Sequence, residues 1–256
     1  MDWPALIDFI RQRDPTFVSG LQGVPDLEIA ALAADHGVTL PTGYAEFLRR
    51  MGLGSNGYTP FGATQDPGFA AISERLDEGD EPTFTRFFPI AIETDDSLEA
   101  LYDHHLDLHR SDGDDATLVL LEQGVPLEWQ TPVETSETFG EHITASVFSQ
   151  FALLHHAHQD TLAVGGKMQA GEGRTALQQT LTLLQRAGFN PVLLLTERVA
   201  CLQSGPLSVL AQVNDVHESL TLRLGSDTSL AVKELADQLL AGLPGARRPA
   251  GPRNLD

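Results

Sequence analysis

The order of the apolar patterns along the chain is the feature that most constrains its fold. Three N-terminal segments place apolar residues at the three- and four-residue spacing of helices: residues 4–13, 25–36 and 42–51. A fourth helix is expected near 68–77, and a strand-like apolar run follows at 84–93. Residues 116–122 and 126–129 predict paired strands, and residues 141–158 predict a closing helix. This succession predicts an α+β domain, with N-terminal helices packed on a mostly antiparallel sheet.

A second unit is expected after the break at Val164-Gly165-Gly166. Residues 173–188 form an amphipathic helix, and residues 227–242 form a last helix that Asp227 or Thr228 caps. Between these helices, four segments rich in Val and Leu are typical of short strands: residues 191–197, 199–204, 207–213 and 217–224. We therefore predict a smaller C-terminal α/β unit, in which helices flank short strands.

The expected organisation has three parts. A first domain covers residues 1–164, and a C-terminal α+β unit covers residues 165–245. The remaining residues, 246–256, are rich in Pro and Gly, which is typical of a flexible tail.

The acidic residues are distributed very unevenly. The chain has 36 Asp and Glu against 16 Lys and Arg, a formal charge of −20. Residues 1–165 hold 28 of the acids and 7 of the bases, whereas residues 166–256 hold 8 acids and 9 bases. Such a field attracts basic surfaces and disfavours nucleic acid or an anionic membrane as a direct ligand. Solubility alone is the other explanation of this charge.

The single cysteine and the absence of long apolar runs predict a cytoplasmic protein. Cys201 has no partner for an intrachain disulfide. The N-terminal residues lack the basic start and apolar run of a signal peptide, and no stretch of about 18 apolar residues exists.

The sequence contains fragments of several catalytic or ligand-binding motifs, but none is complete. Gly52, Gly54 and Gly57 match a dinucleotide-binding glycine pattern, yet they follow a helix instead of a strand. Histidines gather at 104–109 and 155–158 without a recognised metal-ligand spacing. A nucleophile elbow is also missing. We therefore expect a non-catalytic protein without a metal or another cofactor.

The densest acidic stretch is the best candidate for a binding surface. Residues 77–115 contain 13 acids against two arginines, and residues 116–165 add six acids and no base. We predict one acidic surface that binds a basic protein partner. Its candidate residues are Asp77, Glu78, Asp80, Glu81, Asp95, Asp96, Glu99 and Asp103, with Tyr58 and Trp129 as aromatic anchors. Ordinary packing is the alternative role of each aromatic residue.

Residues 27–57, LEIAALAADHGVTLPTGYAEFLRRMGLGSNG, resemble the N-terminal motif of the SUKH superfamily. The segments FFPIAIETDD (87–96) and HITASVFSQFALLH (142–155) are similar to later parts of that family, so the resemblance covers about residues 1–160. The matched motif positions, for which the resemblance implies a structural role, are Glu28, Leu40, Pro41, Tyr44, Phe47, Asn56 and Gly57.

The resemblance to the SUKH superfamily implies a binding scaffold. Bacterial members are typically immunity proteins that neutralise toxins, often nucleases, and eukaryotic members are cell-wall regulators of the Smi/Knr type. The expectation that follows is an immunity protein for a basic toxin. A regulatory scaffold without a toxin partner is the alternative.

Overall fold

The computed structural model describes residues 1–78, 84–165 and 169–249, and the chain divides into two compact units. The first unit ends at Ser146 and the second begins at Val147. Mixed helices and antiparallel sheets confirm the α+β class. Every helix among the described residues is too short or too polar to cross a bilayer.

The division lies earlier in the chain than the predicted boundary at 164/165, and strand pairing explains why. The predicted helix over 141–158 is shorter in the structure: α6 spans Phe139–Phe148, and a π-helical turn, η3, spans Ser149–Leu153. Strand β6 (His158–Gly165) then pairs along its whole length with β10 (Ser219–Ser226). These residues therefore belong to the second sheet, a partnership about 60 positions away in sequence that local patterns do not reveal.

The helices of the first unit lie close to the predicted positions. They are α1 (Trp3–Arg13), α2 (Asp26–Asp35), α3 (Thr42–Met51) and α4 (Phe69–Glu78). A 3-10 turn that the sequence patterns did not predict, η1 (Phe17–Gly20), lies between α1 and α2 in the chain. The side chain of Asp2 caps α1 by accepting a hydrogen bond from the Ala5 amide at 3.0 Å. Each of these α-helices buries an apolar stripe, which confirms the helical periodicity in the sequence.

Within the described residues, the first sheet has the strand order β1-β2-β3-β4-β5, and all pairs are antiparallel. The strands are β1 (Gln65–Asp66), β2 (Phe87–Glu93), β3 (Tyr102–Ser111), β4 (Ala116–Glu122) and β5 (Val133–Thr138). One face carries Phe88 opposite Leu106 and Leu106 opposite Leu118. Tyr44 of α3 packs on this face, with its ring 6.0 Å from that of Phe88.

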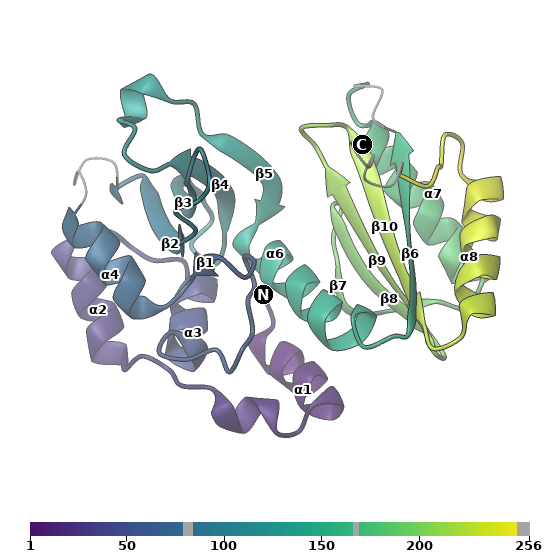
Figure 1. The fold of residues 1–256 in the computed structure, drawn as a ribbon, viewed down its shortest axis with the longest axis horizontal. Helices are drawn as coiled ribbons and strands as arrows, with labels where there is room; N and C mark the ends of the chain where they lie inside the picture. Colours follow the sequence, from purple (N-terminus) through teal and green to yellow (C-terminus); the bar gives the residue numbers. More distant parts are fainter. Residues whose placement is uncertain (79–83, 166–168, 250–256) are drawn as a thin grey trace. The chain divides into compact units, whose positions relative to one another are not determined.

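The opposite face of the first sheet is partly polar. His105 lies directly across from Val119, and Asp103 lies across from Leu121. Helix α4 contacts this sheet along β2 (Figure 1). The face therefore combines buried charged groups with an apolar cluster to which Leu127 adds.

Two predictions for this sheet need correction. Strand β3 is not among the predicted strands, because its buried face carries Asp103, His105 and Asp107 in place of apolar residues. Residues 126–129 do not pair with β4: Leu127–Trp129 form a 3-10 turn, η2. The side-chain nitrogen of Gln130 donates to the carbonyls of Glu122 and Val125, at 3.2 and 2.6 Å, and these bonds hold the segment as a loop.

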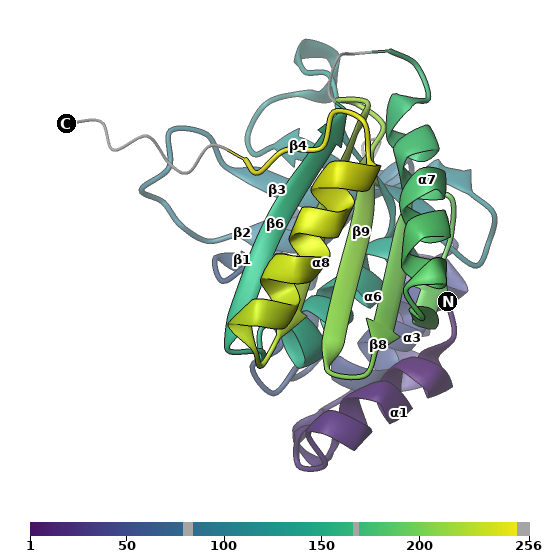
Figure 2. The same cartoon turned by 90° about the vertical axis from the view of Figure 1, so that its right-hand side faces the viewer.

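The second unit is a five-stranded antiparallel sheet, counted over the described residues, with two helices on one face. The strand order is β6-β10-β9-β8-β7, in which β7 is Asn190–Leu195, β8 is Val199–Ser204 and β9 is Leu207–Asn214. Helices α7 (Glu172–Arg186) and α8 (Ser229–Gly242) both cover the same side (Figure 2). The four strand segments and two helices predicted after residue 172 are confirmed, whereas β6 is an addition.

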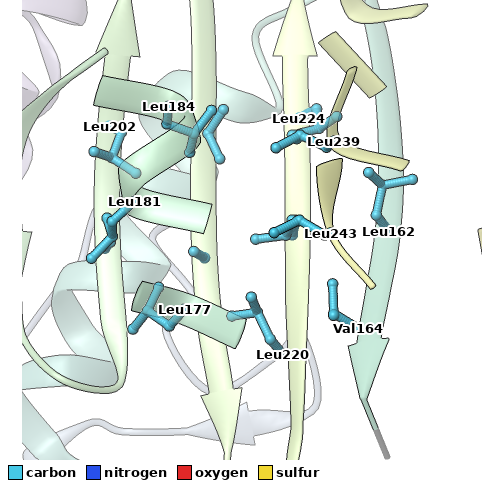
Figure 3. Close-up of a cluster of buried hydrophobic side chains, with 14 of the residues drawn as sticks. Leu162, Val164, Leu177, Leu181, Leu184, Leu202, Leu220, Leu224, Leu239 and Leu243 are labelled. Carbon is cyan, nitrogen blue, oxygen red and sulfur yellow. The ribbon is translucent and has the colours of Figure 1, made fainter. Parts of the chain in front are cut away.

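The core of the second unit is almost entirely aliphatic. Leu177, Leu181 and Leu184 of α7 face Leu202 and Leu220 of the sheet, next to residues of α8 (Figure 3). Close packing extends to the backbone at Gly173, where an added Cβ would lie 2.8 Å from the carbonyl oxygen of Ser219. A side chain at this position would therefore push the start of α7 away from the sheet.

Candidate functional site

A cavity of about 390 Å³ opens on the polar face of the first sheet. Phe84, Leu121 and Leu127 give it an apolar wall. Three carboxylates also line it: Glu78 at the end of α4, Glu122 at the end of β4 and Glu128 in η2. Arg75 and His105 complete its polar lining. The lining of the cavity thus combines an apolar wall with three carboxylates.

Asp103 anchors the polar network behind the cavity. Its side chain is fully buried, and one carboxylate oxygen accepts the Glu93 amide at 2.9 Å and the Gln123 side-chain nitrogen at 2.6 Å. The other oxygen accepts Arg75 Nε at 3.1 Å. A buried carboxylate needs such donors because it has lost its water. Asp103 therefore holds α4, β2 and the β4–β5 loop around the cavity.

His105 lines the cavity and keeps one ring nitrogen as a hydrogen-bond acceptor. Its ring is 2% exposed, and burial lowers its pKa below the usual range, so the ring is neutral at pH 7. Nδ1 lies 3.1 Å from the Asp103 carbonyl oxygen, which only accepts, so Nδ1 carries the proton. Nε2 then keeps its lone pair and makes no hydrogen bond to any described residue.

Trp129 ends the η2 turn, between Glu128 and Gln130, which both line the cavity. Its side chain is 78% exposed, which is unusual for a residue of this size. The turn is fixed to the end of β4, because the Glu122 amide donates to Gln130 Oε1 at 2.7 Å and Gln130 donates back. The loop thus displays Glu128 and Trp129 from a fixed support.

The predicted partner-binding acids do not all come together. Glu78 lines the cavity, and Asp77 lines a different groove between α2 and α4. Asp95, Asp96 and Glu99 follow β2 on its connection to β3 and do not line the cavity. The other two predicted acids, Asp80 and Glu81, lie outside the described residues.

Two predicted partner-binding residues are buried, which corrects the prediction. Asp103 is enclosed by its donors and is not available to a partner. Tyr58 is 1% exposed, and its hydroxyl donates to the Ile143 carbonyl at 3.2 Å. Of the two proposed aromatic anchors, Trp129 alone lies at the surface.

The motif residues build the helical layer instead of a surface site. Pro41 precedes α3, and the rings of Tyr44 and Phe47 stack at 6.2 Å inside the core. Asn56 has a positive φ of 51° and donates to the Phe17 carbonyl at 2.9 Å. Leu40 is buried, Gly57 follows with a φ of 83°, and Glu28 is exposed in the first turn of α2.

The histidine groups have separate roles. His104 lies 4.9 Å from Phe61, ring to ring, and burial together with nearby His142 lowers its pKa to about 3. His156 is within hydrogen-bonding distance of Asp227 and Ser208 in the second unit. In the described part of the chain, no group of three or more His, Cys, Asp and Glu side chains could hold a metal ion.

Most arginines of the first unit form ion pairs with acids of the same unit. This unit has 27 Asp and Glu against seven Arg and no Lys, and all seven arginines are described. At least six pair with acids of the same unit: Arg11, Arg49, Arg50, Arg75, Arg86 and Arg110. The exposed carboxylates that remain therefore have little positive charge near them.

The sequence patterns did not identify Arg75, placed His105 only in a histidine cluster without metal-ligand spacing, and included Glu122 and Glu128 only in the total charge. The missing signal is β3, because without that strand His105 has no defined face. The absence of Lys and Arg over 116–165 is the one indication that the sequence offers for the two glutamates.

Comparison with known proteins gives no further guide. No protein-family model matches the chain, and no curated protein or solved structure matches it either. The function is therefore argued from the site alone.

Proposed function

We propose that the chain is a non-catalytic, cytoplasmic protein-binding module whose first unit captures a basic protein. The observation that carries the proposal is the internal pairing of at least six of its seven arginines, beside many exposed carboxylates. Unpaired charge of one sign creates a field that steers an oppositely charged partner and accelerates its association.

The chemistry of the cavity supports binding over catalysis. A general base works best with a pKa near the working pH, and burial holds the pKa of His105 below its usual range. Its neighbour Asp103 is occupied by three donors. The buried Cys201 thiol, whose pKa burial raises to about 12, is a poor nucleophile.

The partner that this surface suits best is a basic toxin domain, so the proposed role is that of an immunity protein. A nuclease carries basic residues where it holds phosphates, and an acidic inhibitor can occupy that surface. The resemblance of residues 27–57 to the SUKH superfamily supports the same role. The second unit, a separate compact fold, favours the alternative of a regulatory scaffold that joins two partners.

The test is affinity capture from the native host, followed by association kinetics with the protein recovered. We expect one basic protein that binds at 50 mM salt and is released at 500 mM salt. Replacing three exposed acids (Asp77→Asn, Asp96→Asn and Glu99→Gln) is expected to slow association about tenfold at low salt, and much less at high salt, because ions screen these charges.

A charge change in the second unit serves as the control. Glu234→Gln removes an exposed carboxylate of α8 and is expected to change the association rate by less than about twofold. Recovery of no basic protein would contradict the proposal, as would an association rate that changes with neither the salt concentration nor the triple substitution. Recovery of a host regulatory protein that is not a toxin would favour the scaffold.

A further inference from the structure

We infer that the cavity of the first unit receives an arginine side chain of the basic partner, with its guanidinium between the carboxylates and Nε2 of His105. The inference rests on the proposed function, because it names the group by which the partner is held. Its evidence is the set of acceptors around the cavity, the charge there, the apolar wall of the cavity, and the exposed Trp129 next to Glu128 in the chain.

The polar groups of the cavity call for a ligand rich in N–H donors. Nε2 of His105 is an acceptor without a partner among the described residues, in a side chain that is 98% buried. The carboxylates of Glu78, Glu122 and Glu128 make no hydrogen bond or ion pair with any other described residue. A guanidinium offers five N–H donors in one plane and can reach several of these acceptors together.

The charge around the cavity excludes an anionic ligand. Arg75 is paired with Asp103, so these two groups contribute no net charge. No described residue supplies a counter-ion to the three glutamates, and a phosphate or carboxylate placed among them would be repelled. A positive ligand restores the balance that the unit lacks.

The apolar wall and Trp129 suit the remainder of an arginine side chain. The methylene stem packs on apolar surface such as that of Phe84, Leu121 and Leu127, while the charged end meets the polar groups. Guanidinium planes also stack on indole rings, and Trp129 displays its ring next to Glu128. Tryptophan and arginine are the residues most often found at the energetic centre of protein interfaces.

The experiment uses the full chain and the blocked tripeptide acetyl-Gly-Arg-Gly-amide as the probe. The matched peptides carry citrulline, which has the same shape without the charge, or lysine. Trp129 reports binding through its fluorescence, since the other tryptophan, Trp3, is buried. We expect a dissociation constant on the order of 1 mM for the arginine peptide, since one side chain makes few contacts. Binding of the citrulline peptide is expected to be at least about tenfold weaker.

The variants are chosen at the cavity surface so that folding is preserved. Glu128→Gln and Trp129→Ala are each expected to lower the affinity for the arginine peptide about fivefold, because they remove a charge partner and a stacking partner. Glu74→Gln is the matched control, one turn before Glu78 on α4 and outside the cavity lining. For this variant, the change in affinity is expected to stay under about twofold. Binding to the Trp129→Ala variant is measured by NMR chemical shifts.

Three outcomes overturn the inference while leaving the proposed function intact. They are equal binding of the arginine and citrulline peptides, lysine binding as tight as arginine binding, and an equal loss for Glu74→Gln and Glu128→Gln. The proposed function fails separately, when association of the captured protein is insensitive to salt and to the acids of the first unit.

Discussion

The two units of this chain have similar folds but differ in net charge and in the composition of their cores. The first unit carries a formal charge of −20, whereas the second has nine acids, nine bases and no net charge. Each forms an antiparallel sheet covered by helices. Because a similar architecture forms in the second unit without net charge, the excess of acids is not needed to build such a fold, which favours a role in binding.

The core of the first unit is also more polar than the core of the second unit. The first unit buries aromatic rings and four Asp, Glu or His side chains: Asp103, His105, Asp107 and Glu141. The buried polar side chains of the second unit, among its described residues, are the hydroxyls of Thr180, Ser208 and Ser226. Burying ionisable groups costs free energy unless each finds a partner. The unit that bears this cost also contains the candidate site.

Each unit contains its own reporter, so the contrast can be measured in the full chain. Trp3 and Trp129, the two tryptophans, are both in the first unit. Cys201, the single cysteine, is buried in the second unit, and its thiol becomes reactive when that unit unfolds.

The largest expected effect is on the aliphatic core of the second unit. Leu222 is fully buried between strands β6 and β9, so Leu222→Ala leaves a cavity under both helices. The free energy of unfolding is expected to fall by about 4 kcal/mol. The urea dependence of Cys201 reactivity measures it, and a loss below about 1 kcal/mol would show that this core is loosely packed.

The buried ion pair of the first unit gives the next effect. Asp103→Ala removes the acceptor of Arg75, of the Gln123 side chain and of the Glu93 amide. The first unit is expected to lose about 3 kcal/mol, less than for a fully enclosed pair because Arg75 can reach water. Urea unfolding followed by tryptophan fluorescence tests this, with the exposed pair variant Arg110→Ala, expected to cost under about 1 kcal/mol, as the comparison.

Acid should weaken the first unit through His104. Burial lowers its pKa from 6.5 to about 3, so between these values the unfolded chain takes up a proton that the folded chain refuses. The contribution of neutral His104 to the stability of the folded unit is therefore complete above pH 6.5 and is lost as the pH falls toward 3. At pH 5 the expected cost is about 2 kcal/mol.

The His104 effect is isolated by substitution. His104→Gln should flatten the decline in tryptophan-detected stability between pH 7 and pH 5, whereas His109→Gln, an exposed position on the same strand, should not. Equal slopes for wild type and His104→Gln would assign the acid sensitivity to other groups.

The smallest effect concerns two buried tyrosines that are expected to respond with opposite signs. Tyr44 has a fully buried hydroxyl that makes no hydrogen bond to a described residue, so Tyr44→Phe should stabilise the first unit by about 1 kcal/mol. Tyr58 donates to Ile143, so Tyr58→Phe should destabilise it by about 1 kcal/mol. Thermal unfolding detects both, and a loss with Tyr44→Phe would mean that its hydroxyl is satisfied.

Local patterns predicted most of the helices and the second sheet. The stripe containing Tyr44 and Phe47 identified α3 at its observed bounds, because a helix of ten residues records its buried face in its own sequence. Strands β8, β9 and β10 were also located within a few residues, since their Val and Leu residues mark a buried sheet.

The candidate site was much harder to predict. The acidic composition indicated a basic partner, and Trp129 was among the anchors named from sequence. The cavity itself depends on β3, whose inward face holds Asp103 and His105. Sequence patterns treat charged residues as exposed, and they fail where a distant arginine compensates for the burial.

By itself, the sequence determined the charge of each region, the apolar stripes of the helices and the short strands after residue 190, because these are local or additive properties. Tertiary structure alone decided that His158–Gly165 joins the second sheet and that Arg75 meets Asp103 behind a cavity. Both depend on pairing between residues 28 or more positions apart, where the energy of the contact, not the propensity of either segment, selects the partner.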